Sequence, residues 1–104
     1  MKTTTEPAIL TLFQALSDAH RIQIIEALRH QELCACDLAE ALEIKPSKLS
    51  FHLKTLKSAG LIQGRQEGRW IYYRLNLQQF IVVEQYIAEF RRFSAILPAR
   101  VCPD

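Results

Sequence analysis

The sequence contains no apolar run that approaches the roughly 20 residues of a membrane-spanning helix. Its N-terminus, MKTTTEPA, lacks the basic and then apolar pattern of a secretory signal. It has no internal repeat and no low-complexity tract. These absences lead us to expect a cytoplasmic protein.

The sequence also lacks the loops and clusters on which most catalytic sites depend. It has no glycine-rich phosphate loop, no nucleophile elbow and no paired acid site. We therefore do not expect an enzyme.

Cysteine is scarce, and its number is odd. Cys34, Cys36 and Cys102 occur in a chain without an export signal, which argues for reduced thiols rather than a disulfide framework. His20 and His30 have no partner at metal-ligand spacing, so we expect both to be surface or capping residues. Metal binding or redox chemistry therefore falls to the cysteines.

The 104 residues suffice for one domain with a modest core, and their charge is unevenly distributed. Residues 45–74 carry seven basic side chains against one acidic residue, Glu67, whereas the rest of the chain is acidic on balance. A basic segment on an acidic body is typical of a surface that binds a polyanion. The alternative is a solvated basic patch without a partner.

Residues 32–61 predict a helix-turn-helix. We expect a short helix over 37–43, a turn at 44–45 and a second helix over 46–59. Leucines recur at helical spacing in both helices, so each has one apolar face to pack. They are Leu38 and Leu42 in the first helix, and Leu49, Leu53 and Leu56 in the second.

Two helices are expected ahead of this unit. The first begins at Thr5 or Pro7 and ends near Leu16, and the second covers 19–30. Both have apolar residues at helical spacing that we expect to face the core. These are Ile9, Leu12, Phe13 and Leu16 in the first helix, and Ile22, Ile25 and Leu28 in the second, with Ile24 widening the stripe.

A β-hairpin is predicted directly after the helix-turn-helix. Gly60 can end the preceding helix in a left-handed conformation. The β-prone runs 61–66 and 69–75 flank a turn at Glu67-Gly68. A hairpin in this position is the wing of a winged helix, although it can alternatively serve only to close the core.

Two surfaces of this arrangement are predicted to contact DNA. The outward face of the second helix carries donors, cations and one aromatic ring, which suits a major groove better than an idle solvated surface. The basic tip of the wing is expected to reach phosphates or a minor groove. The residues concerned are Ser47, Lys48, Ser50, Phe51, His52 and Lys54 on the helix, and Arg65 and Arg69 on the wing.

A long last helix is predicted from Leu77 to about Ala95, and its apolar stripe is wide for a terminal helix. A winged domain of this size does not cover such a stripe within one chain, so we expect this helix and the first one to form a two-fold dimer interface. Two recognition helices would then meet successive major grooves about 34 Å apart on a palindrome. Residues 1–96 thus form one mainly α domain with a β-hairpin wing, and 97–104 form a C-terminal tail.

Three motifs stand out together: the run Glu32-Leu33-Cys34-Ala35-Cys36-Asp37-Leu38, the segment Ser50-Phe51-His52-Leu53-Lys54-x-Leu56, and the wing Glu67-Gly68-Arg69-x-x-x-Tyr73. They resemble the ArsR/SmtB family of metal-responsive winged-helix repressors over nearly the whole chain. The first motif points more narrowly to the arsenical-sensing branch, the repressors of arsenic-resistance operons.

This resemblance implies a homodimer that occupies its operator without ligand and leaves it when As(III) or Sb(III) binds cysteines ahead of the recognition helix. It carries the ligand role onto Cys34 and Cys36, and DNA reading onto Ser47, Ser50, Phe51 and His52. The arsenical branch often has a third cysteine where this chain has Ala39. We suggest that Cys102 supplies a third thiolate, from the same subunit or its partner. The alternative is a two-thiolate site completed by a small thiol or solvent.

The chemistry of the cysteine pair agrees with this role, because soft thiolates suit thiophilic ions. In a regular helix, residues two apart point about 200° from each other, so Cys34 and Cys36 converge on one ion only if the helix starts irregularly. Ligand capture would then distort the entry to the 37–43 helix and disfavour DNA binding. Glu84 and Glu89 lack the Asp and His partners of the zinc-sensing branch, which disfavours a zinc-only sensor.

Other interpretations of the same residues stay open at this point. Cys34 and Cys36 can be small buried apolar residues without a ligand. A repressor can alternatively respond to oxidation or persulfide at these two cysteines. The chain can also be a winged-helix protein-interaction module, whose nucleic-acid binding would lack the salt dependence of phosphate contacts.

Overall fold

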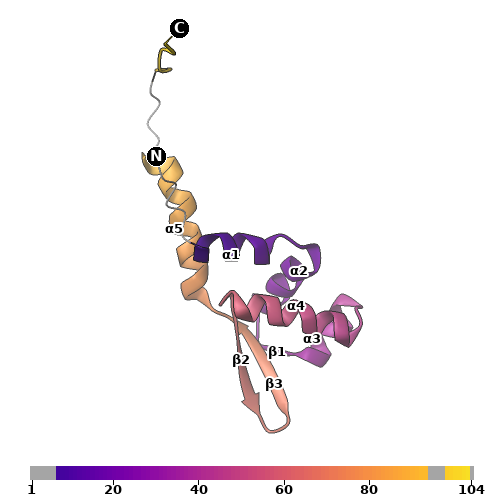
Figure 1. The fold of residues 1–104 in the computed structure, drawn as a ribbon. Coiled ribbons are helices and arrows are strands. Elements are labelled where there is room, and N and C mark those ends of the chain that lie inside the picture. Colours follow the sequence, from indigo (N-terminus) through magenta and orange to yellow (C-terminus); the bar gives the residue numbers. More distant parts are fainter. Residues whose placement is uncertain (1–6, 94–97, 104) are drawn as a thin grey trace.

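The structure is a computed structural model that describes residues 7–93 and 98–103. It is a winged helix-turn-helix, mainly helical with a β-hairpin wing, as predicted (Figure 1). The predicted helix ends at Thr5 and Ala95, and the boundary between 96 and 97, lie outside the described residues. The elements are α1 (Pro7–Leu16), α2 (Ala19–Leu28), β1 (Leu33–Cys34), α3 (Ala35–Leu42), α4 (Pro46–Ser58), β2 (Ile62–Glu67), β3 (Trp70–Leu75) and α5 (Leu77–Phe93).

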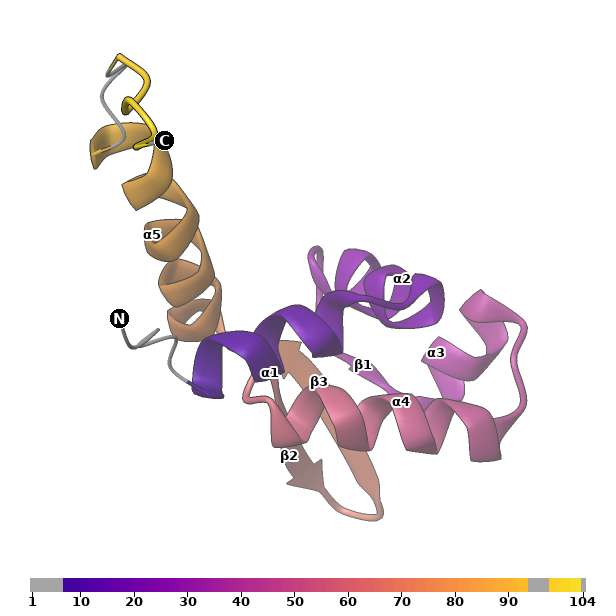
Figure 2. The same ribbon diagram turned by 45° about the horizontal axis from the view of Figure 1, so that its top comes forward.

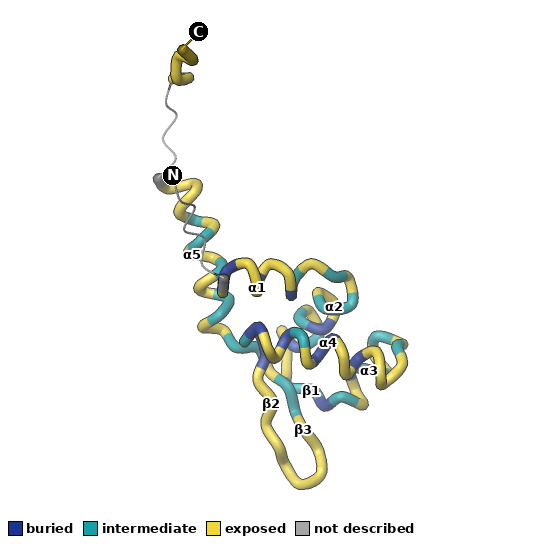
Figure 3. Tube along the Cα trace, in the orientation of Figure 1, coloured by how far each residue is buried: buried dark blue, intermediate teal, exposed yellow. Residues whose placement is uncertain are grey.

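The core lies where α1, α2, α3 and α4 converge at the base of the hairpin, whereas the wing and most of α5 face outward (Figures 2 and 3). The leucine spacing of the helix-turn-helix is confirmed, because Leu38, Leu49, Leu53 and Leu56 are buried and Leu42 packs against them. The largest fully buried side chains are Leu12, Ile24, Leu38, Leu49, Leu56, Leu61 and Ile62. In the described part of the chain, no helix is long and apolar enough to cross a membrane.

The inward face of α2 differs from the predicted one. Ile24 and Leu28 are buried, whereas Ile22, which was expected on the core stripe, is 37% exposed. Ile25 packs at the edge of the core. Apolar residues occur on two sides of this helix, so the spacing alone is compatible with two faces, and packing against the neighbouring helices selects the pair at i and i+4.

The sheet has a third strand that the sequence analysis missed. β1 pairs antiparallel with β3, so the strand order is β1-β3-β2, with Leu33 opposite Tyr73 and Cys34 opposite Tyr72. A strand of two residues is too short to show an alternating pattern. Its consequence is large, because it fixes Cys34 to the wing just before α3 begins.

Two glycines with positive φ lie before the hairpin and in its loop. Gly60 has a φ of 79° and ends α4, as predicted, with the N–H of Leu61 donating to the carbonyl of Leu56 at 3.0 Å. Gly68 has a φ of 63° and begins a two-residue loop, Gly68-Arg69, one residue later than the predicted turn. This loop length matches the tight hairpins that positive φ permits.

The packing of α2 gives a matched test of the core. Ile24→Ala removes a side chain with 0% exposure, and we expect it to lower the free energy of unfolding by about 2–5 kcal/mol. Ile22→Ala, in the same helix, should cost less than about 1 kcal/mol because its side chain is already partly in solvent. Urea denaturation of both variants measures the difference. Equal losses would contradict the inward face described here.

Candidate functional site

The outward face of α4 is polar and accessible, as predicted. Ser47, Lys48, Ser50, Phe51 and Lys54 are all exposed, and the ring of Phe51 is 63% exposed. Pro46 starts the helix at a position where its missing N–H costs nothing. The face can be polar because Leu49, Leu53 and Leu56 bury the opposite side.

The predicted placement of His52 on this outward face is wrong. His52 is only 4% exposed, because it lies three residues after Leu49 and four residues before Leu56, on the inward face of the helix. A ring buried under the helix does not reach a base edge in this arrangement. No partner for a buried histidine could be recognised in the sequence, and the structure shows one in α2.

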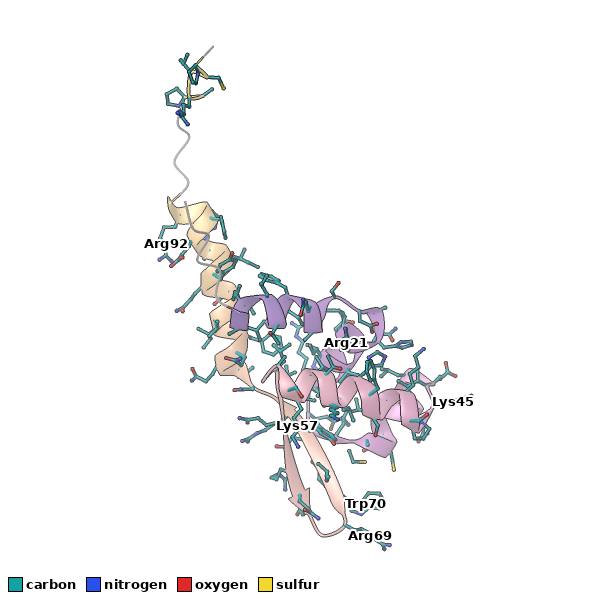
Figure 4. All side chains as sticks on the ribbon, viewed as in Figure 1. Arg21, Lys45, Lys57, Arg69, Trp70 and Arg92 are labelled. Carbon is teal, nitrogen blue, oxygen red and sulfur yellow. The ribbon has the colours of Figure 1, made fainter. Side chains whose placement is uncertain are left out.

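That partner is Arg21, which the sequence analysis did not single out. Its guanidinium donates to the carbonyls of Ala15 and Gln14, at 2.7 and 3.3 Å, and lies 3.1 Å from Nδ1 of His52. Because a guanidinium has no acceptor, this hydrogen bond requires Nδ1 of His52 to be the acceptor. The backbone N–H of Arg21 donates to Asp18 at 3.1 Å, which makes Asp18 the N-cap of α2. Figure 4 shows Arg21 between the α1–α2 corner and α4.

The charges around this contact favour a neutral ring beside an ionised carboxylate. Burial lowers the pKa of His52 below its usual value, against the opposing effect of Asp18. The hydrogen bond from the Arg21 backbone lowers the pKa of Asp18. Arg21 therefore connects the end of α1 and the start of α2 to the recognition helix by hydrogen bonds to backbone carbonyls, to ionised Asp18 and to neutral His52.

The two arginines of the wing differ in their surroundings. Arg69 lies in the loop at the tip, with its guanidinium 5.9 Å from the centre of the Trp70 ring (Figure 4). Arg65 lies within β2, away from the tip, and forms ion pairs with Glu32 at 2.6 Å and Glu67 at 2.7 Å. These carboxylates raise the pKa of Arg65 and compensate its charge. Arg69 is thus the better placed of the two to reach a phosphate.

Cys34 combines burial with an irregular backbone. It is 9% exposed and is the N-cap residue of α3, with an extended φ of −82° and ψ of 167°. Its Sγ donates to Oδ2 of Asp37 at 3.2 Å. The irregular helix start that the Cys34–Cys36 pair needs in order to converge is therefore present in the fold.

The other two cysteines are exposed free thiols in different parts of the molecule. Cys36 lies in the first turn of α3. Cys102 belongs to residues 98–103, which lie beyond the far end of α5 and away from α3 in both views (Figures 1 and 2). Cys34 and Cys36 thus lie two residues apart at one helix start, the first buried and the second exposed, whereas Cys102 lies away from them in the same chain.

The cysteine site and the wing are connected through the sheet. Cys34 is paired with Tyr72 in the register, and Tyr72 is paired on its other side with Arg65. Directly opposed residues of neighbouring strands lie on the same face, so the three side chains form one row. The Arg65 guanidinium lies 5.4 Å from the centre of the Tyr72 ring and binds Glu32, just ahead of β1. Cys34 is therefore joined to the wing by strand pairing.

These features define a winged helix-turn-helix DNA-binding regulator, with an exposed recognition helix, a basic wing tip and a thiol pair beside both. Residues 18–63 match the family described as "Bacterial regulatory protein, arsR family". Over 83 residues the chain is 40% identical to the arsenical resistance operon repressor of Bacillus subtilis. The aligned region covers 77% of this chain and 79% of that protein. The chain belongs to the ArsR family of bacterial transcriptional regulators. The resemblance in its motifs is thereby confirmed.

A further relative is named for cadmium resistance, and a solved structure shares the fold. The cadmium resistance regulatory protein CadC of Listeria innocua is 37% identical over 68 residues, covering 64% of this chain and only 57% of that one. The solved structure of an ArsR-like transcriptional regulator from Rhodococcus sp. RHA1 matches with a TM-score of 0.69 and 31% identity, over 86% of this chain and 89% of that chain. Proteins of this family are DNA-binding regulators and not enzymes.

The different surroundings of the cysteines predict different reactivity. In the reduced native protein, iodoacetamide should alkylate Cys36 and Cys102 quickly and Cys34 slowly, because Cys34 must first become exposed by a local opening. In denaturant the three rates should be similar. Mass spectrometry of the digested protein at successive times measures each site. A native rate for Cys34 equal to that of Cys36 would contradict the buried thiol.

Proposed function

We propose that this chain is a homodimeric repressor that binds a palindromic operator through α4 and the wing, and that As(III) or Sb(III) bound to Cys34 and Cys36 releases it. The observation that supports this proposal best is the position of Cys34. It is at once the last residue of β1, the N-cap of α3 and the neighbour of Tyr72 in the wing strand. A ligand on Cys34 would thus act on the wing directly and on α4 through α3, which packs against α4.

For the operator contacts, we assign phosphate binding to Lys48, Lys54 and Arg69, and base contacts to Ser47, Ser50 and Phe51. Arg65 stabilises the wing through its two carboxylate partners rather than contributing a full free charge. His52 orients the recognition helix from below through Arg21 and does not serve as a base contact.

The backbone at Cys34 supports binding of a thiophilic ion by the thiol pair. Because Cys34 is extended and not helical, the opposed orientation of two helical residues at this spacing is not imposed on the pair. Trivalent arsenic or antimony would supply strong bonds to soft thiolates. The Cys34 thiol must first leave Asp37 and lose its proton, and the first turn of α3 must adjust to let Cys34 and Cys36 converge.

The dimer is inferred from α5, which extends beyond the body of the domain (Figure 1). Phe80, Val83 and Tyr86 pack against the core, and Tyr86 meets Phe13 of α1 with ring centroids 5.9 Å apart. One turn further along, Ile87 and Phe90 are 53% and 60% exposed. They follow the same stripe at helical spacing, so a second copy of α5 and α1 is the surface that would cover them.

The repressor mechanism is tested by fluorescence anisotropy with the reduced protein and labelled upstream promoter DNA. We expect affinity that falls steeply with salt, because phosphate contacts release counterions, and that micromolar arsenite lowers by about 100-fold. Cys34→Ser/Cys36→Ser should bind the DNA equally well and ignore arsenite. Release by peroxide but not by arsenite would instead support the redox alternative, and salt-independent binding would support the protein-interaction module.

The role of Cys102 is decided in the same titration. If the tail supplies a third thiolate, Cys102→Ser should need more arsenite for release while binding DNA normally. An unchanged arsenite response would assign the site to Cys34 and Cys36 alone, completed by solvent or a small thiol. The C-terminal variant leaves the described core untouched, so its fold is not at risk.

The dimer interface is tested by sedimentation velocity at micromolar concentration. Ile87→Glu and Phe90→Glu place a carboxylate in the proposed apolar interface, so both should shift the protein toward the monomer. Gln85→Glu is the matched control, because residue 85 points about 200° away from residue 87 and should leave the dimer intact. A monomeric parent protein, or a dimer that survives both substitutions, would contradict the interface.

A further inference from the structure

Three potential metal ligands from two helices meet beside the Arg21 network. They are Asp18 at the start of α2, His20 in its first turn and His52 in α4, and their ligand atoms all lie within 4.8 Å of one another. We propose that Asp18, His20 and His52 form a binding site for a divalent transition-metal ion such as Zn²⁺, Co²⁺ or Ni²⁺. This site uses none of the cysteines and does not depend on the proposed arsenical response.

The donor set matches this class of ion. Imidazole nitrogen suits zinc, cobalt and nickel, and one carboxylate beside two imidazoles is a common set of three protein ligands that leaves a position for water. Softer ions such as As(III) prefer the thiolates. The two sites of this chain would therefore sort ligands by chemistry.

The geometry needs only small side-chain movements. Ligands of a tetrahedral zinc at about 2.0–2.1 Å from the metal lie about 3.4 Å from one another. Asp18 Oδ1 is already 3.9 Å from Nδ1 of His52, and the His20 and His52 rings have centroids 5.4 Å apart. Asp18 and His20 are half-buried and can rotate, whereas the buried His52 provides a fixed ligand.

The site is also accessible from solvent. An open cavity of about 450 Å³ adjoins it at the α3–α4 turn, lined by His20, Glu43, Ile44, Lys45 and Lys48. Lys48 and Arg21 oppose a cation here, while Asp18 and Glu43 favour it. Tight binding therefore depends on direct coordination and not on the surrounding field.

An ion at this site would act on the recognition helix through Arg21. A neutral imidazole that binds a metal through one nitrogen carries its proton on the other, so neither nitrogen of His52 can then accept a hydrogen bond from Arg21. The ion and Arg21 thus compete for His52. Occupation would replace the link from the end of α1 to α4 by a link from the start of α2 to α4.

The test uses the full chain with Cys34, Cys36 and Cys102 replaced by Ser, titrated with Co²⁺ and followed by visible absorption and calorimetry. We expect one Co²⁺ per chain, with the ligand-field bands of nitrogen and oxygen ligands and no thiolate charge-transfer band. His20→Gln should weaken Co²⁺ binding by roughly tenfold or more, since even an outer partner of a ligand is worth about that much. The matched control is His30→Gln, at the other end of the α2 region, which should bind Co²⁺ like the parent.

Asp18→Asn is the second variant, because asparagine caps a helix as well as aspartate and keeps the fold while it removes the charged ligand. It should also weaken binding, with an unchanged circular dichroism spectrum. Co²⁺ binding that is indifferent to both His20→Gln and Asp18→Asn, or no Co²⁺ binding by the parent, would overturn the proposal. Equal losses in His20→Gln and His30→Gln would overturn it as well, since they would indicate nonspecific binding to histidine.

Discussion

One partly buried polar contact joins the recognition helix to α2, the hydrogen bond between the guanidinium of Arg21 and the ring of His52. The guanidinium of Arg21 donates to the carbonyls of Ala15 and Gln14 at the end of α1, and its remaining N–H edge donates to His52 of α4. Apolar packing of Leu49, Leu53 and Leu56 turns one face of α4 toward the core, and the hydrogen bond from Arg21 to His52 adds a directional contact on that same face. The outward direction of Ser50, Phe51 and Lys54 follows from these contacts on the opposite side of the helix.

Much of this fold could be predicted from the sequence, because its signals are local. The leucine periodicity of α3 and α4, the stop at Gly60 and the two β-prone runs each act within a few residues, and the structure has all of them within one or two residues of the predicted bounds. The features that were missed depend on distant partners. β1 exists because β3 lies beside it, and Ile22 is outward because neighbouring helices favour Ile24. His52 was predicted on the outward face because histidine is a polar residue, and its partner Arg21 could not be recognised from the sequence.

The candidate site divides in the same way. The exposed residues of α4 and the irregular helix start at Cys34 follow from sequence position, so they could be predicted. The pairing of Arg65 with Glu32, 33 residues away, could not, and it changes the meaning of a residue that the sequence presents as a free basic contact. Charge counted along a chain overestimates the charge available to a polyanion wherever folding brings carboxylates to the arginines.

The short β1 suits the proposed release from DNA, which needs only a modest free-energy change. To weaken operator occupancy 100-fold, a ligand must prefer the DNA-free form by only about 2.7 kcal/mol. The elements between Cys34 and the DNA-contacting surfaces are few: a two-residue strand paired with Tyr72 and Tyr73, a thiol hydrogen bond to Asp37 and the first turn of an eight-residue helix. Each intramolecular hydrogen bond contributes about 0.5–1.5 kcal/mol, so rearranging two or three of them supplies a change of this size. Such a rearrangement leaves the large core around Leu38 and Leu56 intact, so the proposed switch would operate without unfolding the domain that carries it.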